Sequence, residues 1–167
     1  MLNKLLILIL GIFVGSTVHA AESVNILIEA TVGATCSVSA STQTVQLGTI
    51  SISATPETIG SYAKPFELTA VCPSGSSYKY GFSSPSNAVE DGCLASPNDE
   101  ALLFCLTDEQ TNKIEITEDE DVRQFEGKLE NGTQTTVFRV VPALSSIYGP
   151  IVAGYHQGHL LVNISID

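Results

Sequence analysis

Four cysteines are the residues whose chemistry depends most on the compartment in which the chain resides. They contain no C-x-x-C pair and have no histidines at ligand spacing, so a zinc site is disfavoured. In an oxidising compartment they would instead form two disulfide bonds, for which three pairings exist. The spacing favours Cys36 with Cys72 and Cys93 with Cys105, because each pair then joins neighbouring strand candidates. We expect structural cross-links rather than a metal site or a reactive thiol.

Three further groups of residues have types that occur in catalytic or metal sites. The acidic stretch Glu115–Glu126 lacks the turn glycine and the terminal glutamate spacing of an EF-hand, which favours a solvated loop over a calcium site. His156 and His159 are three residues apart, so a strand would send them to opposite faces, where they are poor co-ligands. The serines stand in no nucleophile-elbow pattern. We therefore predict no catalytic residue, no metal and no cofactor, and the chain is not expected to be an enzyme.

Composition and charge limit the class of protein further. The chain has 167 residues, of which 44% are hydrophobic, which suits one domain with a modest core. Its formal charge of -11 disfavours nucleic acid and anionic lipid as partners. Only 15% of residues are charged and tryptophan is absent, so the sequence favours many short strands over salt-bridged amphipathic helices. We expect an all-β protein.

Residues 1–20 have the pattern of an export signal. Lys4 precedes an apolar run over 5–14, and small side chains at Val18 and Ala20 suit signal peptidase. The alternative is a transmembrane anchor, but the apolar run is about half the roughly twenty residues that a span needs. We expect cleavage after Ala20 and an acidic, exported mature chain.

The mature chain contains seven to nine strand candidates, no convincing helix and no internal repeat. Pro73–Ser77 and Asn131-Gly132 have the residue types of hairpin turns. Ser83–Asp99 has the composition of a loop, which a bond between Cys93 and Cys105 would attach to the next strand. Turn signals at this spacing predict a two-sheet sandwich. The candidate strands are 24–32, 45–50, 66–72, 78–82, 101–107, 114–116, 125–129, 135–141 and 159–166, and the short segment 37–40 precedes the second of them.

The first candidate strand has an unusual position. Its apolar residues alternate along the strand, with Leu27 as the one large apolar residue on the other face. It stands at the start of the mature chain, before the first cysteine, and Gly33 is expected to separate it from the domain. Residues 21–35 would extend about 50 Å, enough to lie along another sandwich, and burial of their apolar face in a neighbour would contribute on the order of 5–10 kcal/mol. The alternative is that residues 24–32 form the first strand of their own sheet. The apolar face comprises Val24, Ile26, Ile28, Ala30 and Val32.

Taken in order, several segments resemble subunits of chaperone-usher pili over most of the mature chain. The opening Ala34–Ser39 and the Gly154-Tyr155 pair look most like the archaic, spore coat U-like branch of that family. The segments that carry the resemblance are 26–32, 34–39, 45–50, 65–72, 153–155 and 160–166.

The resemblance implies an incomplete immunoglobulin-like β-sandwich that is completed by a donor strand from a partner. Its domains would be the signal peptide 1–20, a donor-strand extension 21–35 and a pilin domain 36–167. The alternating residues 24–32 would be the donor, and Cys36–Cys72 the shared disulfide bond of the family. One wall of the acceptor groove would be formed by Leu160, Val162, Ile164 and Ile166.

The implied function is that of a structural subunit that reaches the cell surface through the periplasm, polymerises by donor-strand exchange, and contributes to adhesion or biofilm formation. The implied partners are neighbouring subunits, a periplasmic chaperone, an outer-membrane usher and a host or surface receptor, but no nucleic acid. Two features depart from the family pattern: the chain ends Ile166-Asp167 instead of having an aromatic residue next to last, and Cys93–Cys105 is an additional pair. The alternative function is a single-domain tip adhesin or another secreted immunoglobulin-like binder that uses Ser83–Asp99 or the acidic stretch as its contact surface.

Overall fold

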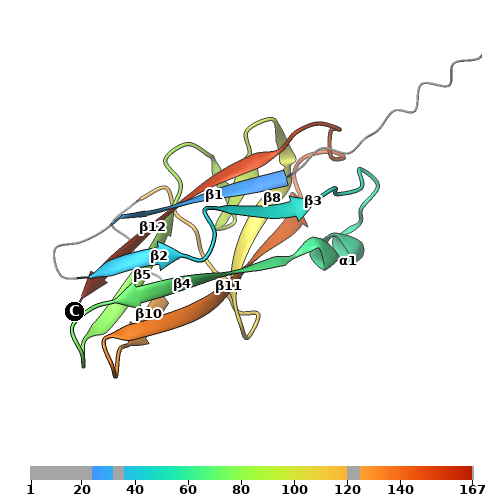
Figure 1. Cartoon of the computed structure of the whole chain (residues 1–167). Helices are drawn as coiled ribbons and strands as arrows, with labels where there is room; N and C mark the ends of the chain where they lie inside the picture. Colours follow the sequence, from blue (N-terminus) through green and yellow to red (C-terminus); the bar gives the residue numbers. More distant parts are fainter. Residues whose placement is uncertain (1–23, 32–35, 120–124, 167) are drawn as a thin grey trace, which may run out of the picture.

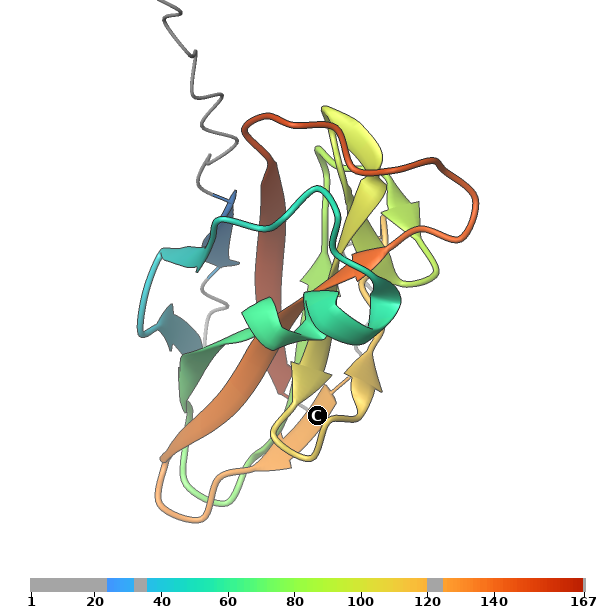
Figure 2. The same ribbon diagram turned by 90° about the vertical axis from the view of Figure 1, so that its right-hand side faces the viewer.

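The chain folds as a sandwich of two β-sheets (Figures 1 and 2). The computed structural model describes residues 24–31, 36–119 and 125–166. The expected signal peptide, Val32 and residues 120–124 of the acidic stretch lie outside these ranges. In spatial order, the first sheet contains β10 (Phe125–Lys128), β5 (Ser77–Ser83), β12 (Gln157–Ile166), β1 (Val24–Thr31) and β3 (Thr44–Gly48).

The second sheet packs across the core from the first. Its strand β9 (Lys113–Ile114) pairs with β8 (Asp99–Asp108), beside the main path of the sheet. Among the described strands, every ladder in both sheets is antiparallel except that of β1 with β12, which is parallel. In spatial order, the main path is β2 (Ser37–Ala40), β4 (Lys64–Val71), β11 (Thr133–Leu144), β8 (Asp99–Asp108), β7 (Cys93–Ser96) and β6 (Val89–Glu90).

Alternation along the strands produces the core. On β4 and β5 the predicted inward faces are buried, including the aromatic side chains of Tyr78, Tyr80 and Phe82. The Tyr80 ring lies 5.8 Å from the ring of Phe138, which β11 supplies from the opposite sheet. Such edge-to-face aromatic pairs stabilise the contact between layers beyond their buried area. The two sheets therefore meet through an aromatic cluster at the centre of the sandwich.

The expectation that no helix is present was wrong in one short segment. A single turn, α1 (Pro56–Ile59), is followed by a 3₁₀ turn at Gly60–Tyr62. Thr55 and Pro56 are residues that favour a helix start, and Ile59 is buried against the core. One turn is too short to show a helical period, which explains why periodicity did not reveal it. Among the described residues, no helix has the length and apolar character needed to cross a membrane.

The turn signals predicted the chain reversals and the strands that flank them, but these strands do not pair as hairpins. Pro73–Ser77 and Asn131-Gly132 each carry the chain from one sheet to the other, because β4 and β11 lie in the second sheet and β5 and β10 in the first. The segment Ser83–Asp99, expected to be a loop, instead contains the β6–β7 hairpin. Its turn is Asp91-Gly92, with positive φ angles of 48° and 68°, which is the conformation that a two-residue hairpin favours.

Candidate functional site

The candidate site is the seam between β12 and β3, which β1 fills in this single chain. The strand β12 begins after the 145–156 loop, and its inward residues form one wall: Leu160, Val162 and Ile164 are buried and Ile166 is partly buried. The strand β3 forms the other wall with buried Val45 and Leu47. The sequence predicted that the β12 residues line an acceptor groove, and this role stays a prediction. It did not single out β3, because the alternation of β3 shows that one face is buried but not which strand lies beside it.

The first strand presents its apolar side to this seam. Ile26 and Ile28 are buried, whereas Leu27, on the opposite side, is 41% exposed. The backbone of β1 pairs with β12 from Asn25 to Thr31, with Ala30 opposite Val162. The chain on its own therefore has residues 24–31 as a strand of its own sheet, which is the alternative that the sequence left open.

The two edges of β1 are held unequally. Seven successive residues, Asn25 to Thr31, pair with β12, but pairing with β3 covers only Val24 to Leu27. One further backbone bond runs from Ile28 N–H to the Gln43 carbonyl at 2.9 Å. Beyond that point the outer edge of β1 has no strand ladder among the described residues. An edge strand of this kind is a site where another strand can add.

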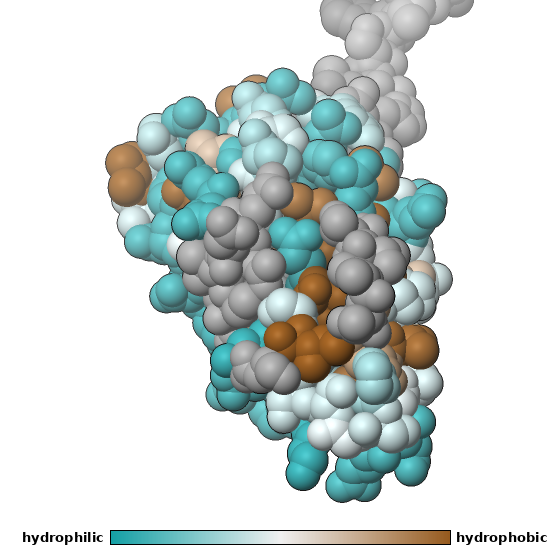
Figure 3. All heavy atoms as spheres, turned by 90° about the vertical axis from the view of Figure 1, so that its left-hand side faces the viewer, coloured by the Kyte–Doolittle hydropathy of each residue, from teal (hydrophilic) through white to brown (hydrophobic). Residues whose placement is uncertain are grey.

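A surface pocket of about 560 Å³ lies along this outer edge of β1. Leu27, Val38 and Leu161 are among the side chains that line it, together with the polar Ser39 and Gln43. Figure 3 shows apolar side chains reaching the surface on the face of the molecule that lies at the left of Figure 1. The seam is thus accessible from outside the sandwich at its less tightly held edge.

Polar contacts on the outer faces fix the register of β1. Glu29 Oε2 lies 3.3 Å from His159 Nε2, and Asn25 Nδ2 donates a hydrogen bond of 2.9 Å to the Tyr155 hydroxyl. The apolar face of the seam requires a residue without a side chain at position 158, because a Cβ atom there would lie only 3.1 Å from the Phe104 ring. Gly158 stands opposite Ile26, so the small residue leaves room for the packing of β8 beneath the start of the seam.

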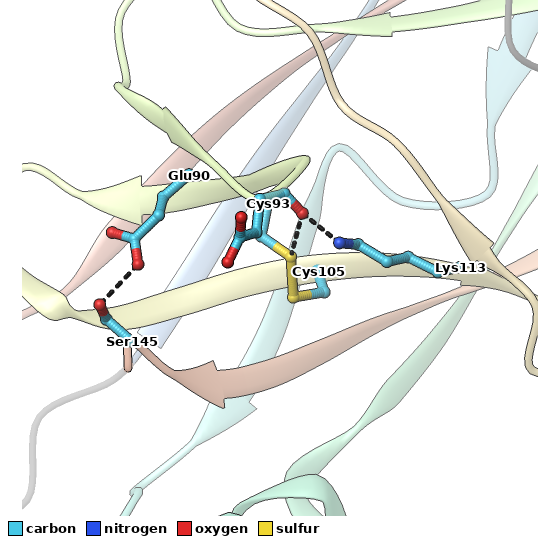
Figure 4. The surroundings of a disulfide bond; sticks show 6 residues. Glu90, Cys93, Cys105, Lys113 and Ser145 are labelled. Carbon is cyan, nitrogen blue, oxygen red and sulfur yellow. Dashed lines mark hydrogen bonds between the residues drawn. A yellow bond between two sulfur atoms is a disulfide. The ribbon is translucent and has the colours of Figure 1, made fainter. Parts of the chain in front are cut away.

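The two disulfide bonds join Cys36 to Cys72 and Cys93 to Cys105, which is the pairing that the spacing favours. The first joins the chain just before β2 to the end of β4, and thereby anchors the body at the point where residues 32–35 lead to β1. The second joins β7 to β8. Figure 4 shows its surroundings, where Lys113 Nζ donates to the Asp91 carbonyl of the hairpin turn.

The histidines and serines are used as structural contacts. Ser96 Oγ lies 3.1 Å from His156 Nδ1, and the other ring nitrogen of His156 lies 2.8 Å from the Val152 carbonyl oxygen. Both side chains are buried. Because His156 faces a backbone carbonyl and not a carboxylate, the pair lacks the third member of an acyl-transfer triad. Within the described ranges, no three His, Cys, Asp or Glu side chains form a group that could hold a metal ion.

What this site can do chemically is bind an extended apolar strand. Backbone groups of β12 supply the hydrogen bonds, and alternate side-chain positions between β12 and β3 supply the contacts.

Comparisons with known proteins give a consistent result. The sequence model of a family described as "Fimbrial protein" matches residues 23–167. The solved structure of the P pilus rod subunit PapA is similar with a TM-score of 0.63 and 16% identity, over 80% of this chain and 100% of that one. A structure of a chaperone-usher pilus, which concerns rod uncoiling, gives a TM-score of 0.59 and 14% identity, over 82% and 91%. No curated protein sequence matches. At these identities the two structures show a shared immunoglobulin-like fold.

Proposed function

The chain belongs to the fimbrial protein family, and we propose that it polymerises by donor-strand exchange, with residues 21–35 as its donor segment. As a member of that family it is a structural subunit of the cell-surface fimbrium that associates with other pilus subunits, and it is not an enzyme. Which strand completes which sandwich in the assembled fibre is the subject of the proposal.

The observation that best supports exchange is the placement of β1. The strand fills an apolar seam, yet it is the first described element of the chain, and only residues 32–35 separate it from Cys36. Its removal would leave Leu160, Val162 and Leu47 beside an open strand edge, a surface that favours association with another strand. A second copy of β1 has the same apolar face and therefore fits the same seam.

The direction of the incoming strand determines the shape of the assembly. If the incoming strand ran parallel to β12, as β1 does, the rest of the donating subunit would lie at the Ile166 end of β12 in the acceptor. The acceptor's own first strand would leave its sandwich at that same end. Two subunits would then exchange strands with each other and form a closed dimer. If it ran antiparallel, its body would lie at the Gln157 end, and subunits would join head to tail without closure. We propose the antiparallel arrangement, because head-to-tail joining produces a fibre and antiparallel ladders are slightly more stable per residue.

Other partners follow from the same surface. A subunit with an empty seam exposes apolar side chains, so a periplasmic chaperone that covers the seam and an outer-membrane usher that oversees exchange are proposed partners. Adhesion or biofilm formation is the proposed result of the assembled fibre, through a host or surface receptor.

Peptide exchange tests this function with the mature chain, residues 21–167. A fluorescent peptide of residues 22–33 is mixed with the purified chain, and its uptake is followed by anisotropy while sedimentation measures assembly. We expect slow uptake of the peptide and growth of multi-subunit species with protein concentration. A peptide with Ile28→Asp is the control and is expected not to bind, because the seam would bury an unpaired carboxylate. A chain that stays monomeric at all concentrations, melts cooperatively and rejects the peptide would contradict donor-strand exchange.

A further inference from the structure

The 145–156 loop between β11 and β12 lies at one end of the sandwich (Figure 2), and it carries several exposed apolar side chains. Ile147 is 72% exposed, Val152 60%, Tyr148 46% and Tyr155 39%. Single exposed apolar residues are ordinary, whereas groups of them favour contact with another protein, and this loop has four within nine positions. Aromatic residues are also the type most enriched where proteins meet. We call these four residues the end patch.

The loop that carries the end patch is held in place at its beginning. Ser145 Oγ donates a hydrogen bond of 2.6 Å to Glu90 of β6 (Figure 4) and accepts the backbone N–H of Ile147 at 3.1 Å. Glu90 belongs to the hairpin that the Cys93–Cys105 disulfide bond joins to β8. The start of the loop is therefore attached to a cross-linked part of the sheet.

Buried groups hold the remainder of the loop. Asp99 Oδ2 accepts the Val152 N–H at 2.6 Å, and His156 is fixed between the Val152 carbonyl and Ser96. Hydrogen bonding to the Glu100 carboxylate, together with its charge, raises the pKa of Tyr148 above its ordinary value. Apolar side chains on a loop fixed in this way are pre-organised, so little ordering entropy opposes their docking.

The end patch adjoins the mouth of the seam. Tyr155 accepts a hydrogen bond from Asn25 at the start of β1, and β12 begins two residues later at Gln157. This is the end at which the body of an antiparallel donor would lie. Only residues 32–35 separate the end of the donor strand from its Cys36, a span of at most about 17 Å. The chain length therefore confines the neighbour's body to the vicinity of the end patch.

We propose that the end patch is the docking surface for the body of the next copy of this chain in the fibre, a contact that adds to the exchanged strand; the inference rests on the proposed function. The neighbour would present its opposite end, where Val71 is half-exposed beside the Cys36–Cys72 disulfide bond. An apolar contact between these two ends would limit how far successive subunits bend about the four-residue connection.

The test compares two single charge substitutions in the full mature chain. Ile147→Glu places a carboxylate in the end patch, and Gln110→Glu places one at an exposed position in the β8–β9 turn as the matched control. We expect both variants to take up the 22–33 peptide as the unchanged chain does, because neither residue lines the seam. Assembly of multi-subunit species should be about tenfold slower for Ile147→Glu and unaffected for Gln110→Glu.

A photo-crosslinking amino acid at position 147 provides a second measurement. In assembled material it should form crosslinks to the region around Val71 of another copy, and the same group at position 110 should not. If Ile147→Glu assembles normally, or if assembled material shows no crosslinks from position 147, the end patch is not the docking surface. Neither result would contradict the proposed strand exchange. Failure of the unchanged chain to take up the peptide or to assemble would instead contradict the proposed function.

Discussion

Ile28 on β1 lies directly opposite Leu160 on β12 in a parallel ladder, and both side chains are buried in the same core. Their contact joins the segment proposed to move to the strand proposed to receive it. In the proposed exchange, the same apolar face would stabilise both the closed single chain and the exchanged fibre. Exchange between the two states depends on the difference between their free energies, and not on burial alone.

Leu160→Ala is expected to lower the free energy of unfolding by about 2–5 kcal/mol, since it removes a fully buried side chain and leaves a cavity in the seam. Leu161→Ala is the matched control, because the neighbouring leucine lies on the opposite face of β12 and is only partly buried. It should cost clearly less. Denaturant unfolding measures both, and equal losses would show that the burial pattern of β12 is not as described.

Tyr80→Phe is expected to leave stability unchanged or raise it by about 1 kcal/mol, because the buried Tyr80 hydroxyl has no hydrogen-bond partner among the described residues. Tyr78→Phe is the control and should be destabilising by about 0.5–1.5 kcal/mol, since the Tyr78 hydroxyl lies 3.3 Å from Thr136 Oγ1. Thermal or denaturant unfolding distinguishes the two. A clear loss of stability in Tyr80→Phe would contradict the assignment.

The same residue predicts a dependence on alkaline pH. Burial, followed by the charge of Tyr78, raises the pKa of Tyr80, so the folded chain holds this proton more tightly than the unfolded chain does. The unfolded phenol ionises near its ordinary value of about 10. The free energy of unfolding should therefore be insensitive to this group below about pH 10 and fall as the pH rises above it. In Tyr80→Phe the decline should be smaller, and an identical decline in both chains would refute the prediction.

Replacing both Cys93 and Cys105 by serine should lower the free energy of unfolding by about 3 kcal/mol, on the chain-entropy account of a short closed ring. Because Glu90 connects the cross-linked hairpin to Ser145, backbone amides over 145–156 should also exchange hydrogen faster. Hydrogen exchange with mass spectrometry measures this, with residues 64–71 of β4 as the internal reference. Unchanged exchange over 145–156 would mean that the disulfide bond does not support the loop.

Local residue patterns were sufficient for much of the secondary structure. Phe66, Leu68 and Ala70 are buried as their alternation predicts, since side chains of a strand alternate between its two faces whatever the strand pairs with. Strand ends were less accurate: the segment expected at 45–50 is β3 at Thr44–Gly48. The pairing of strands was beyond local reasoning, as shown by Asn131-Gly132, which turns the chain between sheets and not within one.

The candidate site was also predictable only in part from the sequence. Alternation in 24–32 and 159–166 identified two apolar faces, but the second wall on β3, the small residue Gly158 at the mouth and the end patch came from the structure. Each of these depends on which distant segments lie side by side. No window of a few residues contains that information.

The sequence by itself determined that the chain is all-β, that its cysteines suit two cross-links and that its first strand has one apolar face, because each follows from residue types and a spacing of two. Only the tertiary structure decided that β1 lies parallel to β12 and that the 145–156 loop adjoins the start of β1. The physical reason is that an alternating strand has the same buried face in either direction. Its orientation and its neighbour are set by the packing of the whole sandwich.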